Sequence, residues 1–334
     1  MSSAPLLHVN DLKVTFRLPK GFLKAPDMLT AVNGVSFQLQ AGETLGIVGE
    51  SGCGKSTLGR AILQLVPPAS GNVLWLGQSL SDQSKKVMRA HRADLQIIFQ
   101  DPLASLDPRM TIGQIIAEPL RVHQPHLSTH EQNAKIKDIM HRVGLRADMI
   151  NRYPHEFSGG QAQRIGIARA IVLRPKLIIC DEPVSALDVS IQSQIINLLK
   201  ALQAEMGMAL IFISHDLSVV RHISHRVMVL YLGRVMEIAH RDALYNAPRH
   251  PYTKALISAV PLPDPDAERA KQRIVLAGDL PSPLNPPSGC LFRTRCPIAQ
   301  DVCAKKEPEL ANVPSQSSTS HHEVQDHQVR CHFT

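Results

Sequence analysis

At 334 residues the chain exceeds one ordinary core, and we expect a large α/β domain with an appendage. The net charge of +7 suits nucleotide phosphates, anionic lipid headgroups or nucleic acid without choosing among them. Aromatic residues are few, and no arginine-aromatic stripe of the kind used for single-stranded nucleic acid is present, so nucleic acid is not an expected partner.

Hydropathy predicts a cytoplasmic protein. The N-terminal residues lack a basic start followed by an apolar run, which a secretory signal would have. No window approaches the roughly 18 apolar residues of a membrane-spanning helix. We therefore expect any membrane role to be peripheral.

Two strands are predicted before the first motif. Apolar residues alternate loosely from Leu6 to Leu18, as in an antiparallel strand, and residues 31–39 form the second such run after a loop at 19–29. Phe16 lies on the first strand, where its ring could stack on a purine. A core position explains Phe16 equally well.

A glycine-rich segment between a short strand (44–48) and a helical pattern (58–65) has the form G-x-x-x-x-G-K-S. Backbone N–H groups at such a turn and at the following helix N-terminus converge on phosphate. Lys55 would reach the β- and γ-phosphates of a nucleotide, and Ser56 would supply a hydroxyl to Mg²⁺. The expected ATP-binding residues here are Gly49, Glu50, Ser51, Gly52, Cys53, Gly54, Lys55, Ser56 and Thr57.

Beyond this loop, a strand (72–76), a polar surface segment (79–92) and a buried run (95–99) that ends at Gln100 are predicted. After Gln100 the apolar pattern changes from that of strands to that of helices. Thr111 and Gln114 form a capping-box pattern, and apolar residues recur at helical spacing up to Gly144. Residues of about 101–165 are therefore predicted to be a helical insertion.

Two further buried runs end on polar residues. Residues 177–180 lead into Asp181 and Glu182, and residues 209–213 lead towards His215. Asp181 could hold Mg²⁺ through water, and Glu182 could polarise an attacking water, although paired acids can also simply begin a loop. A lone histidine after a strand is usually structural. Because ligands bind outside the carboxyl ends of strands in open α/β sheets, we expect these residues to share a crevice with the glycine-rich loop.

Two segments decide the family. Residues 157–161 (FSGGQ) open a predicted helix at 162–173, and residues 185–188 (SALD) follow Glu182. Together with the motifs above, they make residues 6–240 resemble an ATP-binding cassette (ABC) ATPase. The resemblance implies an α/β fold: an ABC-type nucleotide-binding domain with a RecA-like mixed sheet, an antiparallel β subdomain and a helical insertion. We expect this domain at 1–240 and a small C-terminal extension at 241–334.

The resemblance also implies roles for the residues. Phe16 would stack on adenine, Glu182 would be the catalytic base, and His215 would contact the γ-phosphate. Two cassettes would pair head to tail, so that each signature segment covers the nucleotide of the other subunit; a plain capping box is the simpler explanation for the same serine. The implied magnesium ligands are Ser56, Gln100 and Asp181, the signature residues acting in trans are Ser158, Gly159, Gly160 and Gln161, and Asp188 would join the two sites.

More narrowly, residues 99–109, 153–157 and 188–192 look like the ATP-binding subunits of dipeptide and oligopeptide importers, of the F-type. One departure is Ala162, where this group often carries arginine. The missing charge leaves the local strength of the dimer interface open.

The C-terminal region carries a cluster of cysteines. Residues 250–260 resemble the extension of peptide-importer ATPases, and residues 261–287 are rich in proline and linker-like. Four thiols then follow, at Cys290, Cys296, Cys303 and Cys331. In a reducing cytosol they favour a metal over disulfides, as zinc or an iron–sulfur cluster, and free thiols remain an alternative. The resemblance favours [4Fe–4S]. The histidines at 321, 322, 327 and 332 are expected to form a solvated tail.

The resemblance predicts an ATPase, with ATP and Mg²⁺, that drives peptide uptake from the cytoplasmic face of a bacterial inner membrane. Expected partners are a second, D-type cassette, two transmembrane permease subunits and, indirectly, an extracytoplasmic solute-binding protein. Uptake of nickel or another small solute is the first alternative. A soluble ABC protein acting on ribosomes or DNA is the second, but such proteins usually carry two cassettes or a long coiled-coil insertion.

Overall fold

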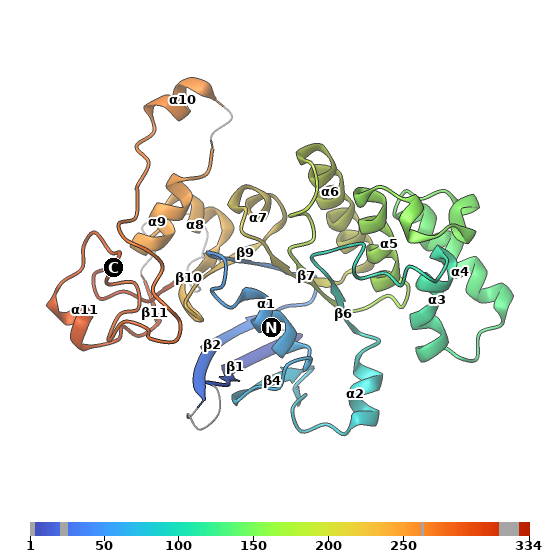
Figure 1. Ribbon diagram of the computed structural model, residues 1–334, viewed down its shortest axis with the longest axis horizontal. Helices are drawn as coiled ribbons and strands as arrows, with labels where there is room; N and C mark the ends of the chain where they lie inside the picture. Colours follow the sequence, from blue (N-terminus) through green and yellow to red (C-terminus); the bar gives the residue numbers. More distant parts are fainter. Residues whose placement is uncertain (1–3, 21–25, 262–263, 314–326) are drawn as a thin grey trace. The chain divides into compact units, whose positions relative to one another are not determined.

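The computed structural model describes residues 4–20, 26–261, 264–313 and 327–334 (Figure 1). These residues form two compact units whose segments alternate along the chain. The first unit contains residues up to 7, residues 39–44 and residues 75–214, and the second contains the remaining segments. Within the described ranges, none of the helices combines the length and apolar character that a membrane span requires.

Three parallel strands form the centre of the first unit. β7 (Leu177–Asp181) lies between β6 (Leu95–Ile98) and β8 (Ala209–Ile213). Every residue of β7 and β8 is buried, as expected for parallel strands covered on both faces. Because the strands are parallel, their carboxyl ends meet at one edge of the sheet, as the sequence predicts.

The predicted helical insertion is confirmed within this unit. α3, α4 and α5 contact one another and are drawn in green in Figure 1. Short 3-10 turns at 147–151 and 154–156 connect α4 to α5. The helices of the unit are α2 (Lys85–His91), α3 (Ile112–His123), α4 (Thr129–Arg142), α5 (Gly159–Ile171) and α6 (Val189–Met206).

Side-chain caps explain where these helices begin. Thr111 and Gln114 form the predicted capping box at α3, where the Thr111 N–H donates to Gln114 Oε1 over 2.9 Å. Ser158 and Gln161 form the same arrangement at α5. Each box satisfies donors that a helix N-terminus otherwise leaves without a partner. Helix α2 was not predicted from sequence: it buries no residue, so it shows no apolar period.

The second unit contains two groups of strands. In one, β1 (Leu7–Leu18) lies between β2 (Asp27–Leu39) and β4 (Ser70–Trp75), and the first three residues of β2 fall within the predicted 19–29 loop. In the other, β3 (Thr44–Val48) runs parallel to β9 (Arg226–Tyr231), which pairs antiparallel with β10 (Arg234–His240). Beyond β10, the chain adds the short strands β12 (Gln328–Val329) and β11 (Ala311–Asn312).

The helices of the second unit are short. α1 (Lys55–Ile62) follows the glycine-rich loop, and α7 (Leu217–Ile223) follows His215 and Asp216. The C-terminal region contributes α8 (Arg241–Asn246), α9 (Pro251–Ser258), α10 (Pro265–Ala270) and α11 (Asp301–Lys305). α10 lies inside the segment that the sequence predicts as a linker.

Candidate nucleotide-binding site

The glycine-rich loop joins the carboxyl end of β3 to the N-terminus of α1, as predicted. The φ angles of Gly49, Gly52 and Gly54 are 152°, 77° and 101°, values that residues other than glycine rarely adopt. A Cβ atom on Gly49 would lie 2.2 Å from the carbonyl oxygen of Leu230, whereas one on Gly52 would meet no atom within 4 Å. The loop is therefore packed against the protein on one side and open beside Gly52.

The Lys55 side chain donates hydrogen bonds to the backbone of the glycine-rich loop itself. Its Nζ donates to the carbonyl oxygens of Gly49, over 2.8 Å, and Glu50, over 3.1 Å, and the side chain is buried. Gly54 gives α1 no side-chain cap at its N-terminus. A buried ammonium group and an uncapped helix start make the loop suited to a phosphate chain.

In the first unit, Gln100 and Glu182 come together after β6 and β7. Gln100 Nε2 donates to Glu182 Oε2 over 3.1 Å, although 82 positions separate these residues in the chain. Asp181 is the last residue of β7 and is buried. Glu182 has a φ of 49°, and its N–H donates to the carbonyl oxygen of Ile213 in β8 over 3.0 Å. Asp181 thus ends the strand, and the chain turns sharply at Glu182.

The signature segment presents an exposed face. Ser158 and Gly159 are exposed at the N-terminus of α5. A Cβ atom on Gly160 would lie 2.6 Å from Cγ2 of Ile191 in α6, so this glycine permits the two helices to approach closely. Ala162 is fully buried, which places a methyl group where the family resemblance leads one to expect a charge. Asp188 is exposed and does not cap α6 with its side chain.

Phe16 and His215 both belong to the second unit. Phe16 on β1 is 36% exposed, so the interpretation of this ring as a core residue is wrong. His215 follows β8 and is exposed just before α7. Both side chains are accessible to a ligand.

Nucleophilic side chains in the core are inactive. Burial raises the pKa of the Cys53 thiol in the glycine-rich loop, an effect that Lys55 opposes. Burial likewise raises the pKa of Cys180 on β7. Both thiols therefore stay protonated at neutral pH.

The four C-terminal cysteines lie near one another. The pKa of Cys290 is raised to about 11, mainly by burial, and the thiols of Cys303, Cys296 and Cys331 contribute in the same direction. The Cys290 N–H donates to the carbonyl oxygen of Cys303 over 2.7 Å, and a Cβ atom on Gly289 would clash with that same oxygen. Among the described residues, no group of three or more histidine, cysteine and acidic side chains has the arrangement of a metal site.

The predicted histidine tail is corrected at two positions. His327 Nε2 lies 2.7 Å from Glu237 Oε1, and the His327 side chain is only 13% exposed. His332 Nε2 lies 3.0 Å from the carbonyl oxygen of Lys306. These two rings therefore fix the last strand and turn instead of forming a solvated tail. The histidines at 321 and 322 lie outside the described residues.

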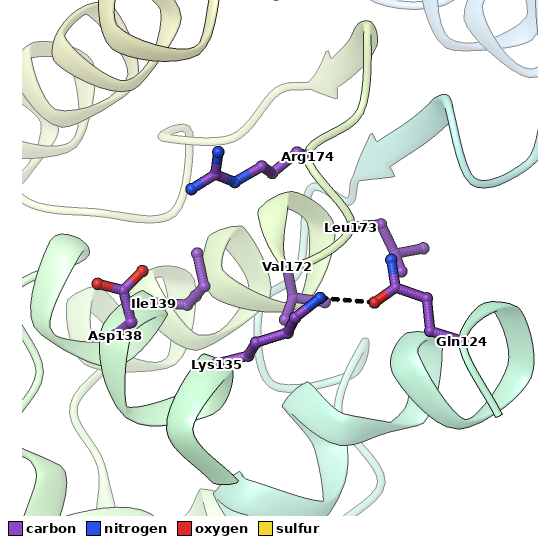
Figure 2. A pocket seen from close by; sticks show the side chains of 7 residues that line it. All are labelled: Gln124, Lys135, Asp138, Ile139, Val172, Leu173 and Arg174. Carbon is purple, nitrogen blue, oxygen red and sulfur yellow. Dashed lines mark hydrogen bonds between the residues drawn. The ribbon is translucent and has the colours of Figure 1, made fainter. Parts of the chain in front are cut away.

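A hollow of about 340 Å³ lies in the first unit among α3, α4 and the segment after α5. Figure 2 shows Lys135 reaching across it to Gln124, with a hydrogen bond of 2.7 Å. It is lined by Gln124, Lys135, Asp138, Ile139, Val172, Leu173 and Arg174. None of the predicted nucleotide-binding residues lines this hollow, so it is a separate feature.

Comparison with known proteins identifies the family. One family model, described as ABC transporter, matches residues 32–185, and another, described as the C-terminal region of oligopeptide/dipeptide transporters, matches residues 236–303. The chain is 61% identical over 310 residues to the oligopeptide transport ATP-binding protein OppF of Haemophilus influenzae, which covers 92% of this chain and 93% of that protein. The chain belongs to the ABC transporter family.

Other relatives agree with this membership. The ABC protein OppF of Escherichia coli is 61% identical over 308 residues, and AppF of Bacillus subtilis is 51% identical over 330 residues, or 98% of this chain and 97% of that one. Among solved structures, the dimeric ATP-binding cassette MJ0796 bound to ADP and Pi has a TM-score of 0.63 and 27% identity, covering 70% of this chain and 98% of that chain. The predicted ABC fold and ATPase activity, coupled to transport, are thereby confirmed.

Two residues that contact the glycine-rich loop of this ABC protein were missed as site residues. The Glu50 N–H donates to Tyr252 Oη over 3.0 Å, and Arg295 Nη1 lies 3.0 Å from each carboxylate oxygen of Glu50. Both residues belong to the C-terminal extension. Their motifs are visible in the sequence, but no local pattern links positions separated by 202 and 245 residues.

Proposed function

We propose that the chain is the ATP-hydrolysing motor subunit of a membrane importer that takes up dipeptides or oligopeptides. The observation that carries the proposal is the glycine-rich loop, whose left-handed glycines and buried Lys55 form a phosphate-binding turn at the start of α1. Relatives named as oligopeptide transport proteins, and the match of residues 236–303, support the peptide cargo.

In this proposal the residues expected from the sequence act on one nucleotide. Lys55 and the loop N–H groups of residues 49–57 bind the phosphates, and Phe16 stacks on adenine. Ser56, Gln100 and Asp181 hold Mg²⁺, which neutralises charge that develops on the phosphates. The oxygen and hydroxyl groups of these side chains are ligands that Mg²⁺ prefers.

Glu182 orients the attacking water and accepts its proton. Its hydrogen bond with Gln100 ties this carboxylate to the segment that enters the helical insertion, so closure of the insertion and positioning of the base are linked. His215 contacts the γ-phosphate. Because catalysis is mainly positioning and charge neutralisation, loss of Glu182 or His215 lowers the rate without abolishing nucleotide binding.

A second cassette completes each site. Ser158, Gly159, Gly160 and Gln161 would cover the nucleotide on the partner, and Asp188 would join the two sites. The exposure of Ser158, Gly159 and Asp188 supports this, because these groups are accessible to another chain. The dimeric state of MJ0796 is a further support. We propose a different, D-type chain as the partner, and a weak ATPase when the chain is alone.

The assembly would lie on the cytoplasmic face of a bacterial inner membrane. Two permease subunits would receive the motion of the helical insertion, and an extracytoplasmic binding protein would deliver the solute. In this proposal, residues 1–240 form the ATPase domain and residues 241–334 the extension. Nickel or another small solute is the alternative cargo, since the cassette does not touch the solute.

The extension offers Cys290, Cys296, Cys303 and Cys331 as ligands for a [4Fe–4S] cluster, with zinc as the alternative. The hydrogen bond of 2.7 Å from the Cys290 N–H to the carbonyl oxygen of Cys303 supports the proposal, because it brings two of these residues together. Four thiolates are a ligand set that both groups accept. Burial raises the pKa of Cys290, Cys296 and Cys331, so binding of the group to their thiolates would release protons.

The test of the motor function is Glu182→Gln in the purified complex. The variant keeps the shape of the side chain and removes the base, so we expect ATP to bind with wild-type affinity while turnover falls at least about 100-fold. Gel filtration with ATP should show a stable dimer of cassettes. Wild-type turnover by the variant complex would exclude Glu182 as the base. Lys55→Ala, which should lose ATP binding, is the companion control.

A further inference from the structure

Glu50 in the glycine-rich loop is held by side chains from outside the loop. Its N–H donates to Tyr252 Oη over 3.0 Å, and its carbonyl oxygen accepts from Lys55 Nζ over 3.1 Å. Its carboxylate receives Arg295 Nη1, which lies 3.0 Å from both oxygens. The backbone and side chain of one loop residue are thus fixed by three groups, two of which come from the C-terminal extension.

The ion pair between Glu50 and Arg295 is well shielded. The Arg295 side chain is 11% exposed and that of Glu50 is 26% exposed. Charge-assisted hydrogen bonds in such a setting are stronger than neutral ones, and they are screened less by salt than pairs on the open surface. The pair therefore has the strength to bias the conformation of a loop rich in glycine.

An aromatic cluster makes the two anchoring side chains rigid. The rings of Tyr231, Tyr252 and Phe292 pack at centroid distances of 4.9, 5.3 and 5.4 Å, and all three side chains are almost fully buried. The Arg295 N–H donates to the carbonyl oxygen of Phe292 over 3.0 Å. The ring of Phe292 thus anchors the turn that presents Arg295, and the ring of Tyr252 anchors the hydroxyl that meets Glu50.

Two of these three groups, Tyr252 and Arg295, are separate from the groups proposed to bind phosphate. Lys55 and the uncapped N–H groups of α1 would bind the anion, whereas Tyr252 and Arg295 hold Glu50. When a loop is already ordered before binding, the ligand does not have to offset the entropy lost on ordering it. Residues that hold the loop therefore raise affinity without touching the ligand.

We propose that Arg295 and Tyr252 are positioning residues for ATP binding: the C-terminal extension sets the conformation of the glycine-rich loop through Glu50. This inference rests on the proposed role of the loop as the ATP site. It gives residues 241–334 a function in the ATPase cycle in addition to any metal group that the cysteines hold. In this proposal the extension and the loop act together in ATP binding.

The experiment measures ATP affinity of the full chain by equilibrium dialysis, for Arg295→Gln, Glu50→Gln and the double variant. Each single variant should weaken ATP binding about tenfold, the factor that corresponds to one hydrogen bond to a charged group. The double variant should bind no more weakly than either single variant, because both substitutions remove the same contact. Tyr252→Phe should weaken binding as well, since it removes only the acceptor for the Glu50 N–H.

Arg293→Gln is the matched control. Arg293 lies in the same turn as Arg295, but its Nε donates to the carbonyl oxygen of Ser288 over 2.9 Å, so this variant should bind ATP with wild-type affinity. In the assembled complex, Arg295→Gln should raise the KM for ATP about tenfold and change kcat less than twofold. A general loss of folding would lower kcat and the fraction of active protein instead.

The outcomes separate the two levels of the proposal. If Lys55→Ala loses ATP binding while Arg295→Gln and Glu50→Gln bind as the wild type does, the loop is the ATP site and the positioning role is wrong. Additive losses in the double variant also overturn the positioning role. If Lys55→Ala binds ATP normally, the loop is not the site, and both proposals fall together.

Discussion

Lowering the pH should reduce the free energy of unfolding of the protein, because His250 in the extension is buried as a neutral ring. This residue caps the N-terminus of α9, where its Nδ1 accepts a hydrogen bond from the Tyr252 N–H over 3.0 Å, and its side chain is 1% exposed. Burial lowers the pKa of His250 to about 4; Glu237 acts in the opposite direction, and the charges of Arg330 and Lys254 add to the lowering. The folded protein therefore holds a neutral ring at neutral pH.

The sign of the effect follows from the direction of this shift. In the unfolded chain, His250 has its ordinary pKa of about 6.5, so the unfolded state binds a proton first as the pH falls. The folded state loses stability from about pH 6.5 down to about pH 4. A shift of about 2.5 units at about 1.4 kcal/mol each corresponds to about 3 kcal/mol, of which about 2 kcal/mol is lost by pH 5.

Urea unfolding at pH 7 and pH 5 measures this loss. The matched variant is His250→Asn, because asparagine also caps helix N-termini and does not titrate in this range. The free energy of unfolding should fall by about 2 kcal/mol more in the wild type than in the variant between these pH values. The buried carboxylate of Glu237, whose pKa is lowered by His327 and neighbouring N–H groups against the opposing effect of burial, contributes only at lower pH. Equal losses in both proteins would show that His250 is not the group responsible.

Two further predictions concern the extension. Phe292→Ala should cost about 3–5 kcal/mol in the free energy of unfolding because it empties a fully buried position between Tyr231 and Tyr252, and urea unfolding with Phe292→Leu as the milder control measures it. Iron and acid-labile sulfide should copurify with the complex prepared without oxygen and disappear in Cys303→Ser. Zinc in place of iron would favour the alternative group, and neither metal in the wild type would mean free thiols.

Local patterns predict much of the site. The glycine-rich loop lies between a buried strand and a helix start, and Asp181 lies at the carboxyl end of a parallel strand, because these features depend on short stretches of sequence. The capping boxes of α3 and α5 are found at the predicted residues for the same reason. Phe16 could not be assigned from its pattern alone, because alternation does not reveal which positions of a twisted strand remain exposed.

Contacts across long separations in sequence escaped prediction. His327 was expected in a solvated tail, yet it reaches a buried carboxylate on β10 that is 90 positions away. Glu50 was predicted as an ATP-binding residue of the loop, but its contact with Arg295 was missed because nothing near it in sequence signals that partner. Both errors share a cause: a polar side chain looks solvent-exposed in sequence, and only the tertiary structure shows the partner that offsets the cost of burying it.

In the positioning role proposed above, the extension influences ATP binding through Tyr252 and Arg295, although both residues are far in sequence from the glycine-rich loop. The groups that meet phosphate in a glycine-rich loop are mostly backbone N–H groups, and substitutions cannot tune these directly. The conformation of the loop is instead adjustable through residues that hold it from behind, which here are Tyr252 and Arg295. Because Arg295 directly precedes Cys296, a change at the cysteines that moves this turn would alter the loop first through Glu50. Under the positioning role proposed for Arg295 and Tyr252, the extension acts on ATP affinity and not on the hydrolytic step at Glu182.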